Sequence, residues 1–332
     1  MSSDGSPIPN GTKRVVIFDT NAYRVFAHGS TLEDVQAKAK QLRGREQQAG
    51  VFVLASPIVV WELVAHLADP ADPALPHCLN AIVALAEHAL SPIASDGGIC
   101  LFADSESTIC WELFHHKPPV NEAVNQNIGS LVTYISKYAP DLTDSVAVQN
   151  IKTIATAVES KEQAWLNQMK VVLGTYCGAN VAKVVFGGCD DNEALRNARA
   201  FFDDDFFMEV WASWLVAEHA TKAKHMVNSP EEFREKTTKL RKEFPVSFYL
   251  MSSLLKKLAT PQPANLDSPR KKRWNFIWDS MIAFSIGPTH EIGGAPMYLV
   301  TGDREIFEAA IAAGSGDRVL TLDNYLKSVG FP

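Results

Sequence analysis

Two apolar runs, one near each end of the chain, are each followed by an acidic residue. Residues 15–18 (VVIF) and 297–300 (MYLV) are continuously apolar, which is typical of strands buried on both faces of a parallel sheet. Asp19 follows the first run directly, and Asp303 ends the TGD sequence that follows the second. In open α/β sheets, ligands bind at the carboxyl edge of the strands. The pattern therefore predicts a parallel sheet with both acids at its ligand-binding edge.

Two predicted helices each enclose one carboxylate in apolar surroundings. Ser56 and Pro57 form a typical N-cap and first-turn pair, so a helix is expected to begin there and to carry Glu62 among apolar residues. The segment FIWDSMIAF predicts a similar helix around Asp279. Removing a lone carboxylate from water is costly, so each of these acids needs a cation or hydrogen-bond donors as partners.

The middle of the chain predicts further helices and shows no internal repeat. Apolar residues recur at helical spacing within 79–90, 124–135 and 148–158. Asp144 is placed to cap the last of these stretches, and SPEE at 229–232 has the pattern of a capping box. Stretches that contain proline or glycine predict connections at 69–76, 91–98, 117–119, 187–192 and 260–269.

The composition is that of an ordinary globular protein. With 332 residues, of which 46% are apolar and 21% charged, the chain suits one large domain or two ordinary ones. No apolar run approaches the length of a membrane span, and the N-terminus lacks the apolar core of a secretion signal, so we expect no membrane segment and a cytoplasmic location. The five cysteines are odd in number and form no CxxC pair, which favours reduced thiols.

Each of the four acids has a simpler interpretation when it is taken alone. An Asp after a strand commonly caps a helix, and a Glu on an apolar helix can pair with an arginine or a backbone amide. Together, however, the four acids indicate a carboxylate-lined metal site, because Mg²⁺ and Mn²⁺ prefer oxygen ligands. Clustered carboxylates also repel one another, so at least one of them is expected to take up a proton in the absence of metal.

In their order along the chain, these motifs resemble those of the PIN-domain nucleases. The resemblance rests on DTN at the end of the first strand, the lone Glu on an apolar helix, Asp followed by SMIA, and TGD at the end of a late strand. RVLTLDNYL is similar to the last strand of these proteins. The resemblance covers residues 14–75 and 245–332, and it implies a three-layer α/β fold with a central parallel sheet. Residues 76–244 are then a large, mostly α-helical insertion.

The resemblance implies a metal-dependent nuclease that hydrolyses phosphodiester bonds in single-stranded or structured RNA. One or two Mg²⁺ or Mn²⁺ ions would activate a water molecule and stabilise charge on the phosphodiester oxygens. The implied ligands, which are also the implied catalytic residues, are Asp19, Glu62, Asp279 and Asp303.

Three further residues are implied as auxiliary members of this site. Asn21 and Thr301 would orient the carboxylates from outside the ligand set. Glu305 would be an additional ligand.

A basic cluster, Arg270, Lys271, Lys272 and Arg273, lies just before Asp279. Two interpretations of it remain open: the cluster holds the phosphate backbone of a nucleic acid, or it is a solvated turn. The net charge of −7 argues against a generally basic surface, but a nuclease needs only a local positive path to its metal site.

Two alternative functions remain open at this stage. One is a structure-specific DNA nuclease of the flap type, and the other is a non-catalytic RNA-binding or scaffold protein with a residual acidic site. The insertion could close over the site, receive an inhibitor protein, select an RNA fold or build a dimer, and by analogy we expect a homo-oligomer. PIN proteins include toxins, ribosomal RNA processing enzymes and decay factors, and the motifs do not separate these roles.

Overall fold

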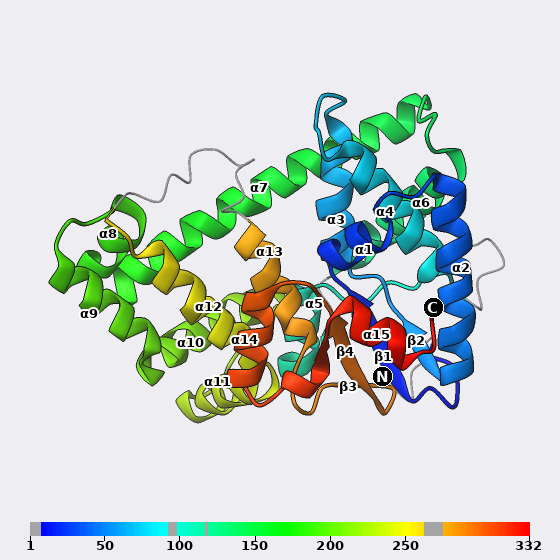
Figure 1. The fold of residues 1–332 in the computed structure, drawn as a ribbon. Coiled ribbons are helices and arrows are strands. Elements are labelled where there is room, and N and C mark those ends of the chain that lie inside the picture. Colours follow the sequence, from blue (N-terminus) through cyan, green and yellow to red (C-terminus); the bar gives the residue numbers. More distant parts are fainter. Residues whose placement is uncertain (1–7, 92–97, 117–118, 262–274) are drawn as a thin grey trace.

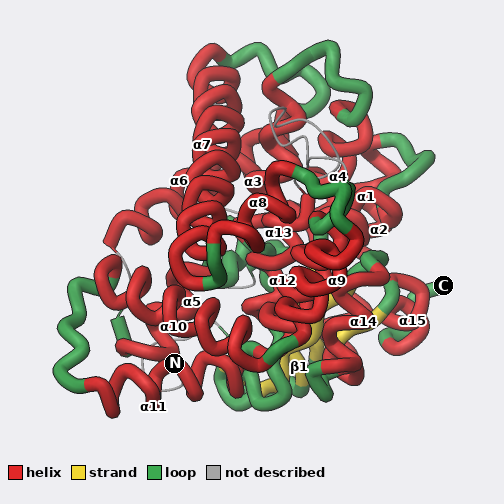
Figure 2. The backbone as a smooth tube through the Cα atoms, turned by 90° about the vertical axis from the view of Figure 1, so that its left-hand side faces the viewer, coloured by secondary structure: helices red, strands yellow, loops and turns green. Residues whose placement is uncertain are grey.

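The computed structural model describes residues 8–91, 98–116, 119–261 and 275–332 (Figure 1). It confirms the mixed α/β class at a coarse level: helices predominate, and they pack beside one small sheet (Figure 2). Within the described residues, no helix combines the length and the apolar character that a membrane crossing needs.

The sheet joins the beginning of the chain to its end. Its strands are β1 (Arg14–Phe18), β2 (Val51–Val53), β3 (Glu291–Ile292), β4 (Ala295–Val300) and β5 (Val319–Leu320). β1 pairs in parallel with β2 on one side and with β4 on the other, and the pairing of β1 with β4 runs from Val15 opposite Met297 to Phe18 opposite Val300. The two expected apolar strands are therefore neighbours, and their carboxyl ends point the same way.

β4 has two further partners along its length. Its last residues pair in parallel with β5, and its first residues pair antiparallel with β3. The hairpin between β3 and β4 turns through Gly293 and Gly294, which have φ angles of 59° and 78°. Both angles lie in the left-handed region, which glycine adopts without steric cost.

Both ends of the described chain lie beside the sheet, whereas α12 packs on α14 and extends toward α8 and α9 (Figure 1). Helix α2 begins at a capping box in which the Thr31 side chain accepts from the Asp34 amide and the Asp34 carboxylate accepts from the Thr31 amide. It ends at Gly50, whose φ of 73° is left-handed. The helices are α1 (Thr20–Phe26), α2 (Leu32–Ala49), α3 (Pro57–Ala65), α12 (Pro245–Leu258), α13 (Asn275–Ile282), α14 (Arg304–Ala312) and α15 (Leu322–Ser328), with 3-10 turns at His66–Ala68, Ala283–Ser285 and Gly316–Arg318.

The described part of residues 76–244 is helical and contains no strand, apart from isolated bridges between Ala55 and Leu101 and between Leu90 and Ile99. Its longest helix, α7, crosses the molecule from the neighbourhood of α3 to that of α8 (Figure 1). As expected, Asp144 caps α7, where it accepts from the amides of Val146 and Ala147. The helices are α4 (Leu75–His88), α5 (Ser105–Phe114), α6 (Pro119–Tyr138), α7 (Ser145–Tyr176), α8 (Ala179–Gly187), α9 (Asn192–Asp203), α10 (Asp205–Lys222) and α11 (Pro230–Glu243).

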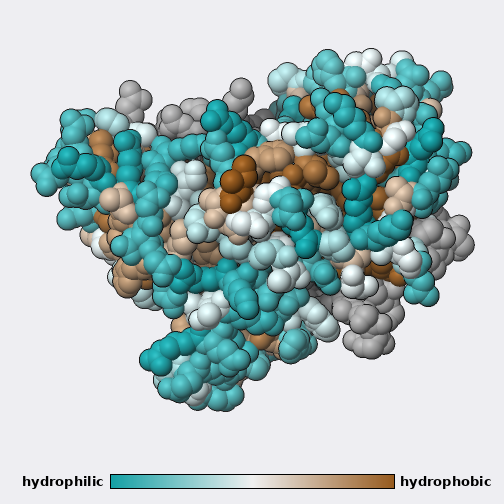
Figure 3. Space-filling view, turned by 60° about the horizontal axis from the view of Figure 1, so that its bottom comes forward, coloured by the Kyte–Doolittle hydropathy of each residue, from teal (hydrophilic) through white to brown (hydrophobic). Residues whose placement is uncertain are grey.

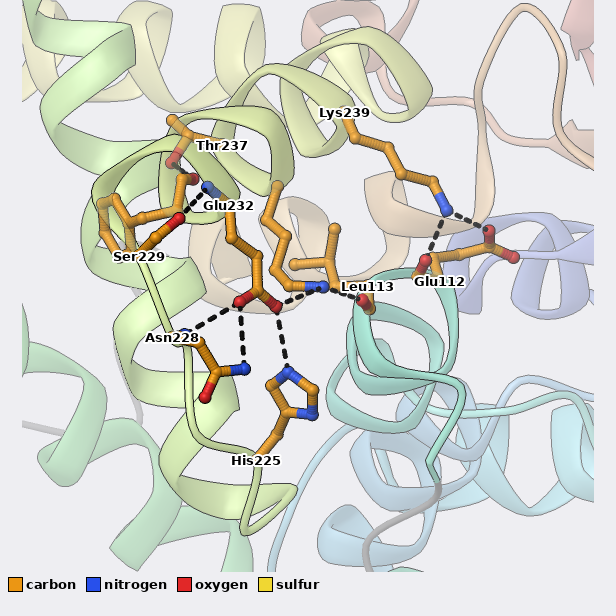
Figure 4. A network of polar contacts seen from close by, with 10 residues as sticks. Glu112, Leu113, His225, Asn228, Ser229, Glu232, Thr237 and Lys239 are labelled. Atoms are coloured by element: carbon orange, nitrogen blue, oxygen red, sulfur yellow. Dashed lines mark hydrogen bonds and ion pairs between the residues drawn. The ribbon is translucent and has the colours of Figure 1, made fainter.

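The expected capping box at 229–232 forms only in part. The Ser229 hydroxyl accepts from the Glu232 amide at 3.1 Å, but the Glu232 carboxylate accepts from the Asn228 amide at 2.8 Å and contacts His225 at 3.2 Å (Figure 4). These donors hold the pKa of Glu232 down at about 2. Lys236 and Lys239 of the same helix donate to backbone carbonyls at the end of α5, at 2.8 and 2.5 Å. The Glu232 carboxylate thus binds donors of the α10–α11 loop, and it does not accept from the Ser229 amide as a complete capping box would require.

One continuous hydrophobic core joins the sheet to most of the helices, and residues 15–18 of β1 are almost completely buried in it. The face drawn in Figure 3 is mainly hydrophilic, with an apolar strip near its middle and smaller apolar areas to either side.

A buried polar cluster ties α15 to the helices at the beginning of the chain. Glu46 of α2 accepts from Nε2 of His88, on α4, at 2.7 and 2.8 Å, and from the Tyr325 hydroxyl of α15. The Tyr23 hydroxyl of α1 lies 3.1 Å from Nδ1 of the same histidine. All four side chains are buried, and each has a partner, so this cluster is a structural link between the two ends of the chain.

Candidate functional site

Four acidic side chains from four different elements line one small cavity. Asp19 follows β1, Glu62 lies on α3, Asp279 lies on α13 and Asp303 precedes α14. The cavity has a volume of about 50 Å³. Its remaining lining residues are Thr20, Asn21, Ile58, Val59, Trp278 and Ile282. The structure thus brings together all four acids that the sequence analysis selected, two from each end of the chain.

The two acids that follow strands also cap helices. Asp19 accepts from the Ala22 amide at 2.5 Å, and Asp303 accepts from the amides of Glu305 and Ile306 at 2.7 and 3.1 Å. Asp19 and Asp303 are therefore N-caps, as the simpler interpretation expects, and both residues also line the cavity. Each cap leaves the second carboxylate oxygen available for another partner.

Thr301 connects these two acids. Its hydroxyl donates to the free oxygen of Asp19 and accepts from the Asp303 amide at 2.9 Å. Thr301 is fully buried, and in sequence it lies between β4 and α14. It therefore links one strand-end acid to the backbone of the other.

Glu62 has a hydrogen-bond partner that the sequence analysis did not single out. Thr20, the first residue of α1, donates its hydroxyl to Oε2 of Glu62 at 2.5 Å. Burial raises the pKa of Glu62, while the Thr20 hydrogen bond and the charges of His66 and Arg24 act in the opposite direction. The only signal for this contact was the threonine next to Asp19 in the DTN motif.

The cavity disfavours negative charge. Burial, with the charges of Asp303, Glu62, Asp19 and Glu305 acting in the same direction, raises the pKa of Asp279 to about 9. Burial also raises the pKa of Asp19 to about 7, although its hydrogen bonds from Thr301 and Ala22 lower it. A carboxyl group with the pKa of Asp279 keeps its proton at neutral pH; burial is the larger cause, and repulsion from the neighbouring acids adds to it.

The other sequence-selected residues lie at different distances from this cavity. Asn21 lines it and is exposed. Glu305 is not among the lining residues. Its Oε1 is paired with Lys257, and its Oε2 is buried without a hydrogen-bond partner among the residues that the structure describes. The basic cluster, Arg270, Lys271, Lys272 and Arg273, lies outside the described residues.

The donor set fits a small, hard cation. Four carboxyl groups supply oxygen ligands, and a cavity of about 50 Å³ suits an ion with bound water and is too small for a nucleotide. In the part of the chain that the structure describes, no three acidic, histidine or cysteine side chains form a group arranged to hold a metal ion. Binding would therefore require the carboxyl groups to lose the retained proton and to turn toward the ion.

A larger cavity of about 890 Å³ lies between α6 and α7. Apolar side chains such as Ile128, Leu131 and Ile154 make up much of its wall, and Trp61 of α3 and Lys161 of α7 lie at its border. Its size would suit a ligand, but it offers no set of converging acids comparable to the small cavity.

Comparisons of the chain with models of known protein families, with curated proteins and with solved structures give no match.

Proposed function

We propose that this protein is a metal-dependent ribonuclease with a PIN-like fold, which hydrolyses phosphodiester bonds in single-stranded or structured RNA. The observation that carries the proposal is the cavity lined by Asp19, Glu62, Asp279 and Asp303, with two acids from each end of the chain. Three of these acids, Asp19, Glu62 and Asp279, have pKa values that burial raises. Such shifts are costly for folding, and such costs concentrate at functional sites.

The order and placement of the elements support the PIN-like part of the proposal. β1 and β4 are parallel neighbours, so the acids that follow them lie at the same edge of the sheet. α3 and α13 then add one acid each from helices that contact one another. These are the element types on which the resemblance to PIN-domain nucleases rests.

The four acids would hold Mg²⁺ or Mn²⁺, which when bound supplies an activated water and stabilises charge on the phosphodiester oxygens. Thr301 and Thr20 hold the carboxylates of Asp19 and Glu62 in fixed directions through their hydroxyl groups. Ile58, Val59 and Ile282 form an apolar wall that limits the access of water. Because the cavity is too small for a nucleotide, the RNA backbone would lie across its mouth.

Because Asp279 retains a proton, the proposed metal binding and activity should depend on pH. Asp279 must lose its proton before it can act as a ligand, and burial together with its acidic neighbours raises its pKa to about 9. Metal binding therefore competes with protons, so activity should rise with pH through the neutral range at a fixed, subsaturating metal concentration.

The test is cleavage of end-labelled single-stranded RNA by the purified protein in Mn²⁺, Mg²⁺ or EDTA. Asp303→Asn should lower the cleavage rate by at least about 100-fold. Asp323→Asn, which changes an exposed acid on α15, is the matched control and should leave the rate unchanged.

Three outcomes would contradict the proposal. Cleavage that persists in EDTA would exclude the metal-dependent mechanism. Cutting of flapped DNA with intact RNA would favour the DNA nuclease, and RNA binding without any cleavage would favour the scaffold protein.

A further inference from the structure

Each of the two acids on helices is preceded in sequence by a buried tryptophan. Trp61 precedes Glu62 on α3, and Trp278 precedes Asp279 on α13. The two indole rings contact each other edge to face, with centroids 6.4 Å apart and an interplanar angle of 73°. Trp278 also lines the carboxylate cavity. The tryptophan pair is therefore a direct side-chain link between the two helices that supply these acids.

Two consecutive residues of α7 hold this pair. The Nζ atom of Lys161 lies 4.2 Å from the centroid of the Trp61 ring, within the range of a cation–π contact. Oε1 of Glu162 accepts a hydrogen bond from Nε1 of Trp278 at 2.8 Å. One turn later on α7, Trp165 packs edge-on against Phe276 of α13, with centroids 5.3 Å apart. One short stretch of α7 thus contacts residues beside both acids.

The Glu162 contact is specific in its chemistry. Glu162 is buried, and a buried carboxyl group needs a hydrogen-bond partner. The indole N–H is a donor only, and it points in one direction in the plane of the ring. A hydrogen bond to it therefore fixes the orientation of Trp278, which a purely apolar neighbour would not do.

We propose that Lys161 and Glu162 form a clamp, supplied by the helical middle of the chain, that positions Glu62 and Asp279 relative to each other through Trp61 and Trp278. The clamp rests on the proposed function, because it acts on two of the implied metal ligands. Lys161 and Glu162 are positioning residues: neither lines the small carboxylate cavity, and Lys161 lines only the larger one. A displacement of about 1 Å in a metal ligand strongly lowers the affinity for the metal and the reaction rate. A contact to the tryptophan that precedes each ligand in sequence can therefore affect both.

The test compares Mn²⁺ affinity, measured by isothermal titration calorimetry, in the full chain and its Glu162 variants. Glu162→Ala should weaken binding by about tenfold or more. Glu162→Gln keeps an oxygen that can accept from the indole, so its affinity should stay within about threefold of the original chain. Gln163→Ala, at an exposed and uncharged position of the same helix, is the matched control and should have no effect.

A double-mutant cycle separates positioning from loss of core packing. If Glu162 acts through the indole N–H, Glu162→Ala should add little to the effect of Trp278→Phe on Mn²⁺ affinity. Fully additive effects, or equal losses in Glu162→Gln and Glu162→Ala, would overturn the clamp.

Fluorine NMR of protein labelled with 5-fluorotryptophan tests the clamp without metal. Glu162→Ala should move the resonances of both Trp61 and Trp278, assigned by single Trp→Phe variants, and Glu162→Gln should move them less. Unchanged resonances in Glu162→Ala overturn the clamp. If the original chain binds no Mn²⁺, the proposed function fails, and the resonances still decide whether the clamp exists.

Discussion

Replacing Asp279 by asparagine should stabilise the metal-free protein while it disables the proposed site. Burial and its acidic neighbours raise the pKa of Asp279 from 3.8 to about 9. Between these two values the folded chain retains a proton that the unfolded chain releases. The free energy of unfolding therefore falls as pH rises through this window. Asparagine has nearly the same shape and no proton to release, so the variant escapes this loss.

The size of the effect follows from the same pKa values. One pKa unit corresponds to about 1.4 kcal/mol, so at pH 8 retention of the proton lowers the free energy of unfolding by at most about 6 kcal/mol. Local relaxation and water entry reduce such figures, and a gain of about 2 to 3 kcal/mol at pH 8 is the expected result. At pH 5, close to the unfolded pKa, the gain should shrink below about 1 kcal/mol.

The assay is thermal unfolding in EDTA at pH 5 and pH 8. For a chain of this length, a gain of 2 to 3 kcal/mol corresponds to a rise in Tm of about 3 to 4 °C. In saturating Mn²⁺ the original chain should have the higher Tm of the two, because it gains stability from the bound ion and Asp279→Asn gains less. Asp323→Asn serves as the control for a charge change at an exposed position.

Two results would refute this reasoning. A lower Tm for Asp279→Asn at pH 8 in EDTA would show that the charged carboxylate has compensating partners. A gain of the same size at both pH values would show that the proton of Asp279 is not its source.

Three further predictions concern residues around and beyond the site. Thr301→Val removes the hydroxyl that donates to Asp19, so the Mn²⁺ affinity measured by calorimetry should fall about tenfold. Thr301→Ser should restore it, and an unchanged affinity in the valine variant would contradict this role. Gly287→Ala would place a Cβ 1.8 Å from the carbonyl oxygen of Glu243, the last residue of α11, so Tm should fall by several °C. Gly44→Ala has open space around its Cβ and should not lower Tm. Equal Tm values for Gly287→Ala and the original chain would disprove the clash. Tyr325→Phe leaves buried Glu46 with one donor fewer and should cost about 1 to 3 kcal/mol in chemical unfolding, and no loss would show that the hydroxyl is dispensable.

The strands and the acids beside them could be predicted because their signals are local. Four consecutive apolar residues identify β1 without knowledge of its neighbours, and an Asp at the end of such a run lies at the sheet edge whatever covers the sheet. The same local signal could not decide between a cap and a ligand for Asp19 or Asp303. In the structure, Oδ1 of each acid caps a helix, and both residues also line the cavity.

The contacts that set the geometry of the site could not be predicted, because they join residues far apart in sequence. The bond between Glu162 and Trp278 spans 116 positions, and nothing in helical periodicity specifies which buried carboxylate meets which indole. The contacts of Glu232 with the α10–α11 loop could not be predicted either, because SPEE predicts a box closed on Ser229, whereas the loop supplies the carboxylate with other donors. The resemblance to PIN-domain nucleases stays a prediction.

The most direct test of the central claim is anomalous diffraction from crystals of the full chain soaked in Mn²⁺. A divalent ion in the carboxylate cavity should give a peak about 2.1 Å from oxygens of at least two of the acids Asp19, Glu62, Asp279 and Asp303, and EDTA should abolish it. No peak in the cavity at millimolar Mn²⁺ and pH 8, with the four carboxyl groups unmoved, would contradict the proposal that this cavity is a metal site.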